Sequence, residues 1–398
     1  MLRQRAQDAG TLAARVAAQL RARNPVVRAF FERESPRLAR AAEAMAERFA
    51  HGGKLYAFGN GPYATDAAHI SVEFIHPVIV GKRALPALDA SAAPDPFLSA
   101  LAGPDDMAIA FGPPGGDLRT LAALRTARRR GAYAVAWPGD DADYAVSAPS
   151  DDEHLHQEIF EVLGHALYES VHVFLEHRGE LGEDVGASAF LYPYLGTAQR
   201  DKASIVDDVA ASVDAKARDG EALREQIAAE QSEAIAAALL AMRDRLDAGG
   251  RLLMFGNGGS ATDATDFALD CVLETPGRPA IPAISLASEA AVLSAIANDV
   301  GTELMFVRQL IAQSRPGDVA FAFSTSGGSK NVVAALEEAR RRGLLTVALL
   351  GYDGGEIVRR NLADHAIVVR CDYIPRIQET QAAVYHVMRR ALGEADVA

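Results

Sequence analysis

The chain contains the same ten-residue pattern twice, and this internal repeat limits the possible folds more than any other feature. Residues 58–67 read FGNGPYATDA and residues 255–264 read FGNGGSATDA, so eight of ten positions are identical at an offset of 197 residues. That offset is about half of the 398-residue chain. A repeat at this distance indicates two domains of similar architecture. We call them copy one (residues 1–180) and copy two (201–398), joined by a Gly-containing linker at 181–200.

Each copy shows the same order of expected elements. A helical pattern precedes a short apolar strand, a glycine turn and another helix, and further strands and helices then alternate. The expected strands are 54–58, 107–111 and 132–137 in copy one, and 251–255, 319–323 and 345–350 in copy two. This alternation predicts an α/β fold in which helices flank a parallel sheet on both faces.

Composition excludes several classes of protein. The formal net charge of -13 disfavours a nucleic-acid-binding groove, although one local loop can still hold a small anion. Only two cysteines are present, which does not suit a disulfide framework. No apolar run reaches the roughly 18 residues of a membrane span, and the first residues lack the pattern of a signal peptide. We therefore expect a cytoplasmic protein with neither nucleic acid nor membrane as partner.

The repeated glycine turn is a candidate phosphate-binding loop. A strand that runs into a glycine turn and then a helix offers N–H groups and the positive end of the helix dipole. In copy two, Asn257, Gly258 and Ser260 are the candidate binding residues of this turn. Copy one has Pro62 and Tyr63 where copy two has glycine and serine, and it therefore lacks the small hydroxyl. Many such turns need glycine for packing alone.

A second loop separates the copies more sharply. Residues 324–329 of copy two read STSGGS between an apolar strand and a helix, which predicts a phosphate cradle formed by Ser324, Thr325, Ser326 and Ser329. Ser329 is also expected to cap the helix, but a cap needs only one hydroxyl. The matching stretch of copy one, 111–117, reads FGPPGGD: its prolines offer no N–H and Asp117 would repel phosphate. Copy one also lacks most of the counterpart of residues 298–315.

Together these motifs resemble a known family. The sequence FGNGGSATDA, the 324–329 loop, the Asp-Gly-Gly at 353–355 and the Arg-Ile-Gln-Glu at 376–379 are similar to the SIS (sugar isomerase) domain of phosphoheptose isomerases. The resemblance covers about 180 residues of copy two and, more weakly, about 150 of copy one. It implies two SIS domains, each a five-stranded parallel sheet in a flavodoxin-like three-layer α/β/α arrangement. The implied reaction converts sedoheptulose 7-phosphate into D-glycero-D-manno-heptose 7-phosphate.

The resemblance also implies a metal and acid–base set. The family has a His and a Glu four residues apart after the first loop, and a Gln and a His eight apart near the last helix. Copy one matches all four positions, with His69, Glu73, Gln157 and His165 as expected zinc ligands. Copy two offers a weaker metal set at the same positions: Asp266, Asp270, Gln378 and His386. Gln378 is in addition a candidate substrate-binding residue.

The isomerase reaction explains why such residues are needed. A proton moves between adjacent carbons through an enediol, so a base, an acid and a cation are useful. We therefore expect Glu73, His165, Asp270 and His386 to be catalytic. His69 and Glu73 share one helix face, and nitrogen and oxygen ligands suit zinc. Gln157 and His165 would be about 12 Å apart along a helix axis, so this spacing alone does not establish a metal site.

The sequence leaves several alternatives open. The copies could form composite sites in which His69 and Glu73 serve a sugar phosphate held by copy two, or copy two could act alone beside a degenerate copy one that keeps a structural metal. The substrate could be another ketose phosphate, such as a hexulose or pentulose phosphate. The chain could instead be a non-catalytic SIS regulator that senses a phosphosugar or binds a partner protein. Fusion of two copies predicts a homodimer that mimics the tetramer implied by the family.

Overall fold

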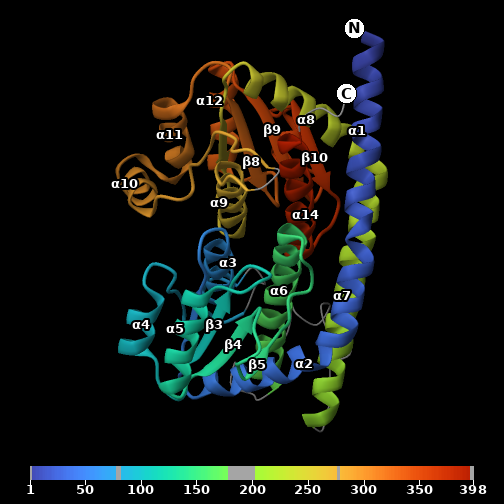
Figure 1. Cartoon of the computed structure of the whole chain (residues 1–398). Helices are drawn as coiled ribbons and strands as arrows, with labels where there is room; N and C mark the ends of the chain where they lie inside the picture. Colours follow the sequence, from blue (N-terminus) through green and yellow to red (C-terminus); the bar gives the residue numbers. More distant parts are fainter. Residues whose placement is uncertain (1, 78–81, 178–201, 276–277, 395–398) are drawn as a thin grey trace. The chain divides into compact units, whose positions relative to one another are not determined.

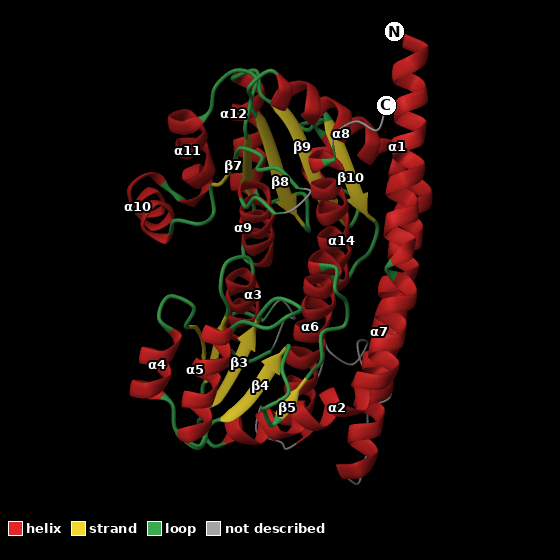
Figure 2. Ribbon diagram, viewed as in Figure 1, coloured by secondary structure: helices red, strands yellow, loops and turns green. Residues whose placement is uncertain are grey.

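The computed structural model describes residues 2–77, 82–177, 202–275 and 278–394, and it contains two five-stranded parallel sheets. In the ribbon view each sheet is flanked by helices (Figure 2). The strands of the first sheet are β1 (Leu55–Phe58), β2 (Ala87–Asp89), β3 (Met107–Phe111), β4 (Tyr133–Trp137) and β5 (Tyr144–Ala145). Those of the second are β6 (Leu252–Phe255), β7 (Ala283–Ser285), β8 (Val319–Ser324), β9 (Leu345–Gly351) and β10 (His365–Val369).

The two sheets have the same topology. Their strand orders are β2-β1-β3-β4-β5 and β7-β6-β8-β9-β10, and all pairs are parallel. This is the 2-1-3-4-5 order of flavodoxin-like folds. The expected α/β architecture with two parallel sheets is thus confirmed, and the short strands β2, β5, β7 and β10 add to those predicted from apolar runs.

Helices cover both faces of each sheet. In the N-terminal half they are α2 (Asn24–Ala50), α3 (Tyr63–Ile75), α4 (Pro94–Leu101), α5 (Leu118–Arg129) and α6 (Glu153–His177). The C-terminal half contains α8 (Ser232–Asp247), α9 (Gly259–Val272), α10 (Ala290–Val300), α11 (Met305–Gln313), α12 (Lys330–Arg341), α13 (Gly355–Arg359) and α14 (Ile374–Gly393), with the short 3-10 helix η1 (Thr302–Leu304) between α10 and α11. Two further helices are α1 (Leu2–Ala22) and α7 (Lys202–Glu230).

Alternation along the strands explains the layers. In β3, Met107, Ile109 and Phe111 are buried with α2, α3 and α6, whereas Ala108 and Ala110 are buried with α4 and α5. The C-terminal sheet follows the same rule, with α1, α8, α9 and α14 on one face and α11 and α12 on the other. Strands that are apolar at every position are typical of a parallel sheet covered on both sides.

The first helix belongs to the C-terminal copy by its contacts. Residues Met1–Asn24 group with Gly220–Ala398, and Pro25–Asp219 form the other unit. Leu12, Val16 and Leu20 of α1 are buried in the core that α8 and α14 also share (Figure 1). The grouping therefore differs from a simple division at the linker, and the linker expected at 181–200 lies outside the described residues. Among the described helices, none is long and apolar enough to cross a membrane.

Candidate phosphosugar site

The glycine turns of copy two lie at the point where the strand order reverses. The connections from β6 and β8 leave these neighbouring strands at their carboxyl ends, which is where open α/β sheets bind ligands. Gly258 adopts a φ of +57° and lets the chain turn directly into α9. A Cβ on Gly256 would come within 2.4 Å of the Ser260 carbonyl oxygen. These glycines hold buried Ser260 in the first turn of α9.

Hydroxyl groups gather in the loop between β8 and α12. Ser324 Oγ accepts a hydrogen bond from Gly327 N–H at 3.1 Å and lies 3.5 Å from Ser329 Oγ. Ser326 Oγ accepts one from Gly328 N–H at 3.2 Å. Thr325 is half-buried and Ser326 is exposed. The four predicted hydroxyl residues thus lie in one turn at the N-terminus of a helix, which is the arrangement expected for an anion site.

Ser329 occupies the N-cap position of α12 but does not cap it with its side chain. Its backbone is extended, with φ -62° and ψ 117°, and its hydroxyl makes no cap hydrogen bond. The expectation of a side-chain cap is therefore wrong. A hydroxyl that does not accept from the helix N–H groups remains available to a ligand at the same end of the helix.

The turn after β9 packs closely against this loop. Gly327 has a φ of +59°, and a Cβ there would come within 2.2 Å of the Gly354 carbonyl oxygen. Ile357 N–H donates to the Gly327 carbonyl at 3.0 Å. The Asp-Gly-Gly motif at 353–355 therefore has a packing role, because only glycine permits two turns to approach this closely.

Copy one has a carboxylate at the corresponding position. Asp117 is the N-cap of α5, and its Oδ1 accepts from the N–H groups of Arg119 and Thr120 at 2.7 and 2.9 Å. Asn60 Nδ2 donates to the other oxygen at 3.3 Å. Partial burial would raise the pKa of Asp117, but the hydrogen bonds from Thr120, Asn60 and Arg119 outweigh it and lower the pKa. In copy one the helix N-terminus thus binds an anion of its own chain.

The asparagine of each glycine turn also has a different hydrogen-bond partner in the two copies: a neutral amide in copy two and a carboxylate in copy one. In copy two, Asn257 and Asn331 exchange two amide hydrogen bonds of 2.8 and 2.9 Å, and no charge is involved. Asn60, the counterpart of Asn257, pairs with ionised Asp117. The loop of copy two is neutral, whereas that of copy one is already negative.

Copy two also contains a cluster of four polar side chains between α9 and α14. Tyr385 Oη donates to Asp266 Oδ2 at 2.9 Å, and His386 Nε2 lies 3.3 Å from the same oxygen. Asp270 Oδ2 is 3.7 Å from His386 Nε2. Asp266, Asp270 and His386 can place three ligand atoms within 4.8 Å of one another. Asp270 is the most accessible of these three, with 12% of its side chain exposed.

Gln378 is on the same helix as His386, about two turns nearer its N-terminus. Its side chain is buried, and among the described residues none donates a hydrogen bond to its Oε1.

Copy one brings two histidines together between α3 and α6. His69 Nε2 lies 3.2 Å from His165 Nε2, and both rings are buried. Burial, together with the neighbouring His165, lowers the pKa of His69 to about 3. His69, Glu161 and His165 offer three ligand atoms within 4.8 Å of one another. The sequence analysis predicted both histidines but not Glu161.

The other two predicted ligands of copy one lie differently. Glu73 Oε1 is 3.9 Å from His69 Nε2, and among the described residues none forms a hydrogen bond with the Glu73 carboxyl group. Burial raises the pKa of Glu73 to about 7, with His165 opposing this rise and Glu169 adding to it. Gln157 directs its amide Nε2 to both oxygens of Asp66, at 3.2 and 3.3 Å.

Two residues of these clusters were missed, and only one of them had a signal in the sequence. Glu161 precedes His165 by four residues and therefore shares its helix face. Tyr385 has no such signal by itself, because it replaces Gly164 of copy one and only the packing of α9 against α14 brings it to Asp266.

Comparison with known proteins places the chain in a family. A family model described as the SIS domain matches residues 20–94 and 217–351, together more than half of the chain. The chain therefore belongs to the SIS domain family. Within it, the chain is similar to a phosphoheptose isomerase of Geotalea daltonii, with 43% identity over 176 residues that span 43% of this chain and 91% of the relative. A phosphoheptose isomerase of Chlorobaculum tepidum is 44% identical over 170 residues, which are 42% of this chain and 80% of that protein.

Solved structures resemble the chain over nearly its full length. The C-terminal domain of glucosamine-fructose-6-phosphate aminotransferase from Francisella tularensis matches with a TM-score of 0.57 at 10% identity, covering 95% of both chains. Glucosamine-6-phosphate deaminase from Thermotoga maritima matches with a TM-score of 0.51 at 12% identity, covering 95% of this chain and 92% of its own. At such identities the likeness concerns the fold alone.

Proposed function

We propose that the chain is a phosphosugar isomerase that converts sedoheptulose 7-phosphate into D-glycero-D-manno-heptose 7-phosphate. The observation that most supports this is the loop of copy two, where the Ser324, Ser326 and Ser329 hydroxyls surround a helix N-terminus. The kinship with phosphoheptose isomerases indicates the reaction class. The phosphate group would bind to this loop, with Asn257, Gly258, Ser260, Thr325 and Gln378 completing the binding site.

In this proposal, Asp270 and His386 transfer the protons of the reaction. Isomerisation removes a proton from the carbon beside the carbonyl group and returns it to the neighbouring carbon through an enediol. Asp270 is suited to be the base because it combines a partly exposed side chain with a position beside His386 Nε2. Asp266 holds the His386 ring and the Tyr385 hydroxyl through one carboxylate oxygen. His386 would protonate and deprotonate the substrate oxygens.

Zinc fits the residues of copy one better than those of copy two. Two imidazoles on a tetrahedral zinc, with Zn–N bonds of about 2.0–2.1 Å, have their nitrogens about 3.4 Å apart. The observed 3.2 Å between the Nε2 atoms of His69 and His165 is close to this value. We propose His69, Glu161 and His165 as ligands, with Glu73 and the Gln157 carbonyl as neighbouring groups. A zinc ion at these residues would neutralise the nearby carboxylates and would hold α3 against α6 in copy one.

The cluster of copy two has two carboxylates and one imidazole, and Asp266 already accepts a hydrogen bond from Tyr385. Oxygen-rich sets favour harder cations such as Mg²⁺ or Mn²⁺. We therefore propose that copy two catalyses the reaction and that copy one is a structural partner. Both cysteines are free, in keeping with the proposed cytoplasmic location, and the proposed assembly is a homodimer.

The test is turnover of sedoheptulose 7-phosphate by the purified chain, followed by NMR of the sugar product, before and after removal and return of zinc. Formation of the heptose phosphate is the expected result. If the chain binds sugar phosphates but converts neither this substrate nor a pentulose or hexulose phosphate, it is a sensing or partner-binding SIS protein and the catalytic assignments fall.

A further inference from the structure

Copy two contains an apolar helix, α10, that its own fold covers only in part: Val292, Leu293 and Ile296 are half-buried, and Leu293 packs against the core beside α11 and α12. Eight of the eleven residues of α10 are Ala, Val, Leu or Ile, yet none of the eleven is buried. Val300, at its end, is 49% exposed and Ile311, on α11, is 44% exposed. A helix of this length is marginal in water unless its apolar face is packed against something. We call α10, η1 and α11 the arm (residues 290–313).

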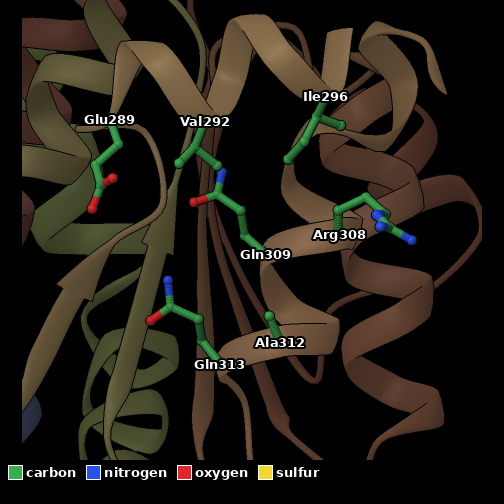
Figure 3. A pocket seen from close by; sticks show the side chains of 7 residues that line it. All are labelled: Glu289, Val292, Ile296, Arg308, Gln309, Ala312 and Gln313. Atoms are coloured by element: carbon green, nitrogen blue, oxygen red, sulfur yellow. The ribbon is translucent and has the colours of Figure 1, made fainter. Parts of the chain in front are cut away.

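A groove runs between the two helices of the arm. It has a volume of about 350 Å³, and its apolar lining consists of Val292, Ile296 and Ala312 (Figure 3). The amide groups of Gln309 and Gln313 form part of the same wall. Gln309 is fixed in place, because its Nε2 donates to the carbonyl oxygens of Leu286 and Met305 at 2.7 and 3.2 Å. One wall of the groove is therefore held in a fixed conformation.

Two opposite charges mark the ends of the groove. Glu289 precedes α10 at one end and Arg308 projects from α11 at the other (Figure 3). Neither residue forms an ion pair with another part of the chain that the structure describes. An apolar strip with a negative and a positive end is complementary to itself after a twofold rotation, which brings Glu289 opposite Arg308 and Arg308 opposite Glu289.

The described residues of copy one form no equivalent surface. Between β2 and β3 copy one has only the eight-residue helix α4, whose Leu98 is fully buried in the core beside α5. The part of the chain that the structure describes therefore has one arm. A single self-complementary surface per chain produces a closed pair and no larger assembly.

We propose that the arm is a dimerisation surface, in which the groove of one chain receives the arm of a second copy and Glu289 pairs with Arg308 of the partner subunit. This supplies a specific interface for the homodimer proposed above. It does not depend on the isomerase reaction, because its readout is molecular mass and affinity.

The experiment is analytical ultracentrifugation of the full chain over a concentration series. We expect a dimer, and we expect Ile296→Arg to weaken its dissociation constant by about 100-fold or more, since a charge would enter the centre of the apolar contact. Leu101→Arg is the matched control, because Leu101 is 52% exposed on α4, the counterpart of the arm in copy one. It should leave the dissociation constant unchanged. Circular dichroism melting confirms that both variants are folded.

If Ile296→Arg is unstable, reversing the charges of Glu289 and Arg308 tests the same interface. Glu289→Arg alone should weaken the dimer about tenfold or more, and the double variant Glu289→Arg/Arg308→Glu should restore it. A chain that remains monomeric at all concentrations overturns the proposal. A dimer that tolerates both Ile296→Arg and Glu289→Arg overturns it as well, because the copies then associate elsewhere. Loss of turnover with an intact dimer would instead contradict only the proposed function.

Discussion

The two copies share a fold and differ at the same two places. The first place is the N-terminus of the helix that follows the third strand of each copy. There copy two has Ser329, whose hydroxyl does not cap the helix, whereas copy one has Asp117, whose carboxylate does. Between the helix after the glycine turn and the last helix, copy one pairs His69 with His165, whereas copy two pairs Asp266 with His386. In the function proposed above, one scaffold thus provides a neutral anion site in one half and a nitrogen-rich metal site in the other.

Strand order therefore places a site but does not determine its chemistry. Both copies position a glycine turn and a helix N-terminus at the switch point of a 2-1-3-4-5 sheet. A single side chain at the N-cap then decides whether that helix end remains open to an anion from solution. Exchanging such residues between the copies tests the proposed division of labour.

The largest effect is expected for the proposed base. Asp270→Asn should lower kcat by about a thousandfold, because general-base catalysis typically contributes 10²–10⁴. The corresponding change in copy one, Glu73→Gln, should cost less than tenfold. Steady-state kinetics with sedoheptulose 7-phosphate measure both values. Equal losses for the two variants would show that copy one takes part in the chemistry.

The next largest effect is expected for the stabilisation of the folded protein by zinc, which should depend on residues of copy one and not on those of copy two. Saturating zinc at about 1,000 times its dissociation constant should stabilise the stripped protein by about 4 kcal/mol. His165→Ala should abolish this gain, and Glu161→Ala should reduce it, whereas Asp266→Ala should preserve it. Thermal melting and zinc content by mass spectrometry are the readouts. If Asp266→Ala removes the zinc and His165→Ala does not, the assignment of the metal to copy one is wrong.

Glu73 should make the stability of the stripped protein depend on pH. Its pKa is about 7 in the folded chain, mainly because of burial, and near 4.5 when unfolded. The folded state therefore binds more protons between these values, so this residue destabilises the fold as pH rises from about 4.5 to 7. Glu73→Gln should remove a loss of about 3 kcal/mol over that interval. Denaturation curves at several pH values that run parallel for both proteins would contradict this.

The smallest effect is expected when the Ser329 hydroxyl alone is removed, and it concerns the affinity for the sugar phosphate. Ser329→Ala removes one hydrogen bond to a charged group, which should weaken sugar phosphate binding by about tenfold. Thr120→Ala, at the start of the counterpart helix α5, should leave that affinity as it is. Titration calorimetry measures both constants. Similar losses in both variants would mean that the two helix ends contribute alike.

Much of the fold followed from the repeat, and less of the site did. The duplicated turn predicted two sheets, and apolar runs located their central strands, but β2 and β7 are three residues long and too short for a clear pattern. The packing of α1 onto α8 was not predicted, since an amphipathic helix shows that it has a partner but not which one. His69 and His165 came from spacing and resemblance. Glu161 joins their group only because α3 and α6 pack together, and the hydrogen bonds from the Gln157 amide to Asp66 had no signal in the sequence.

The most direct test of the proposed division between the copies is an exchange of the two N-cap residues. Titration calorimetry with sedoheptulose 7-phosphate would compare the wild-type chain with Ser329→Asp and Asp117→Ser. We predict one site per chain. The affinity should be about 100-fold lower in Ser329→Asp, because a carboxylate then occupies the helix N-terminus, and unchanged in Asp117→Ser. Undiminished binding by Ser329→Asp would contradict the account, because the sugar phosphate would then not be held by the loop of copy two.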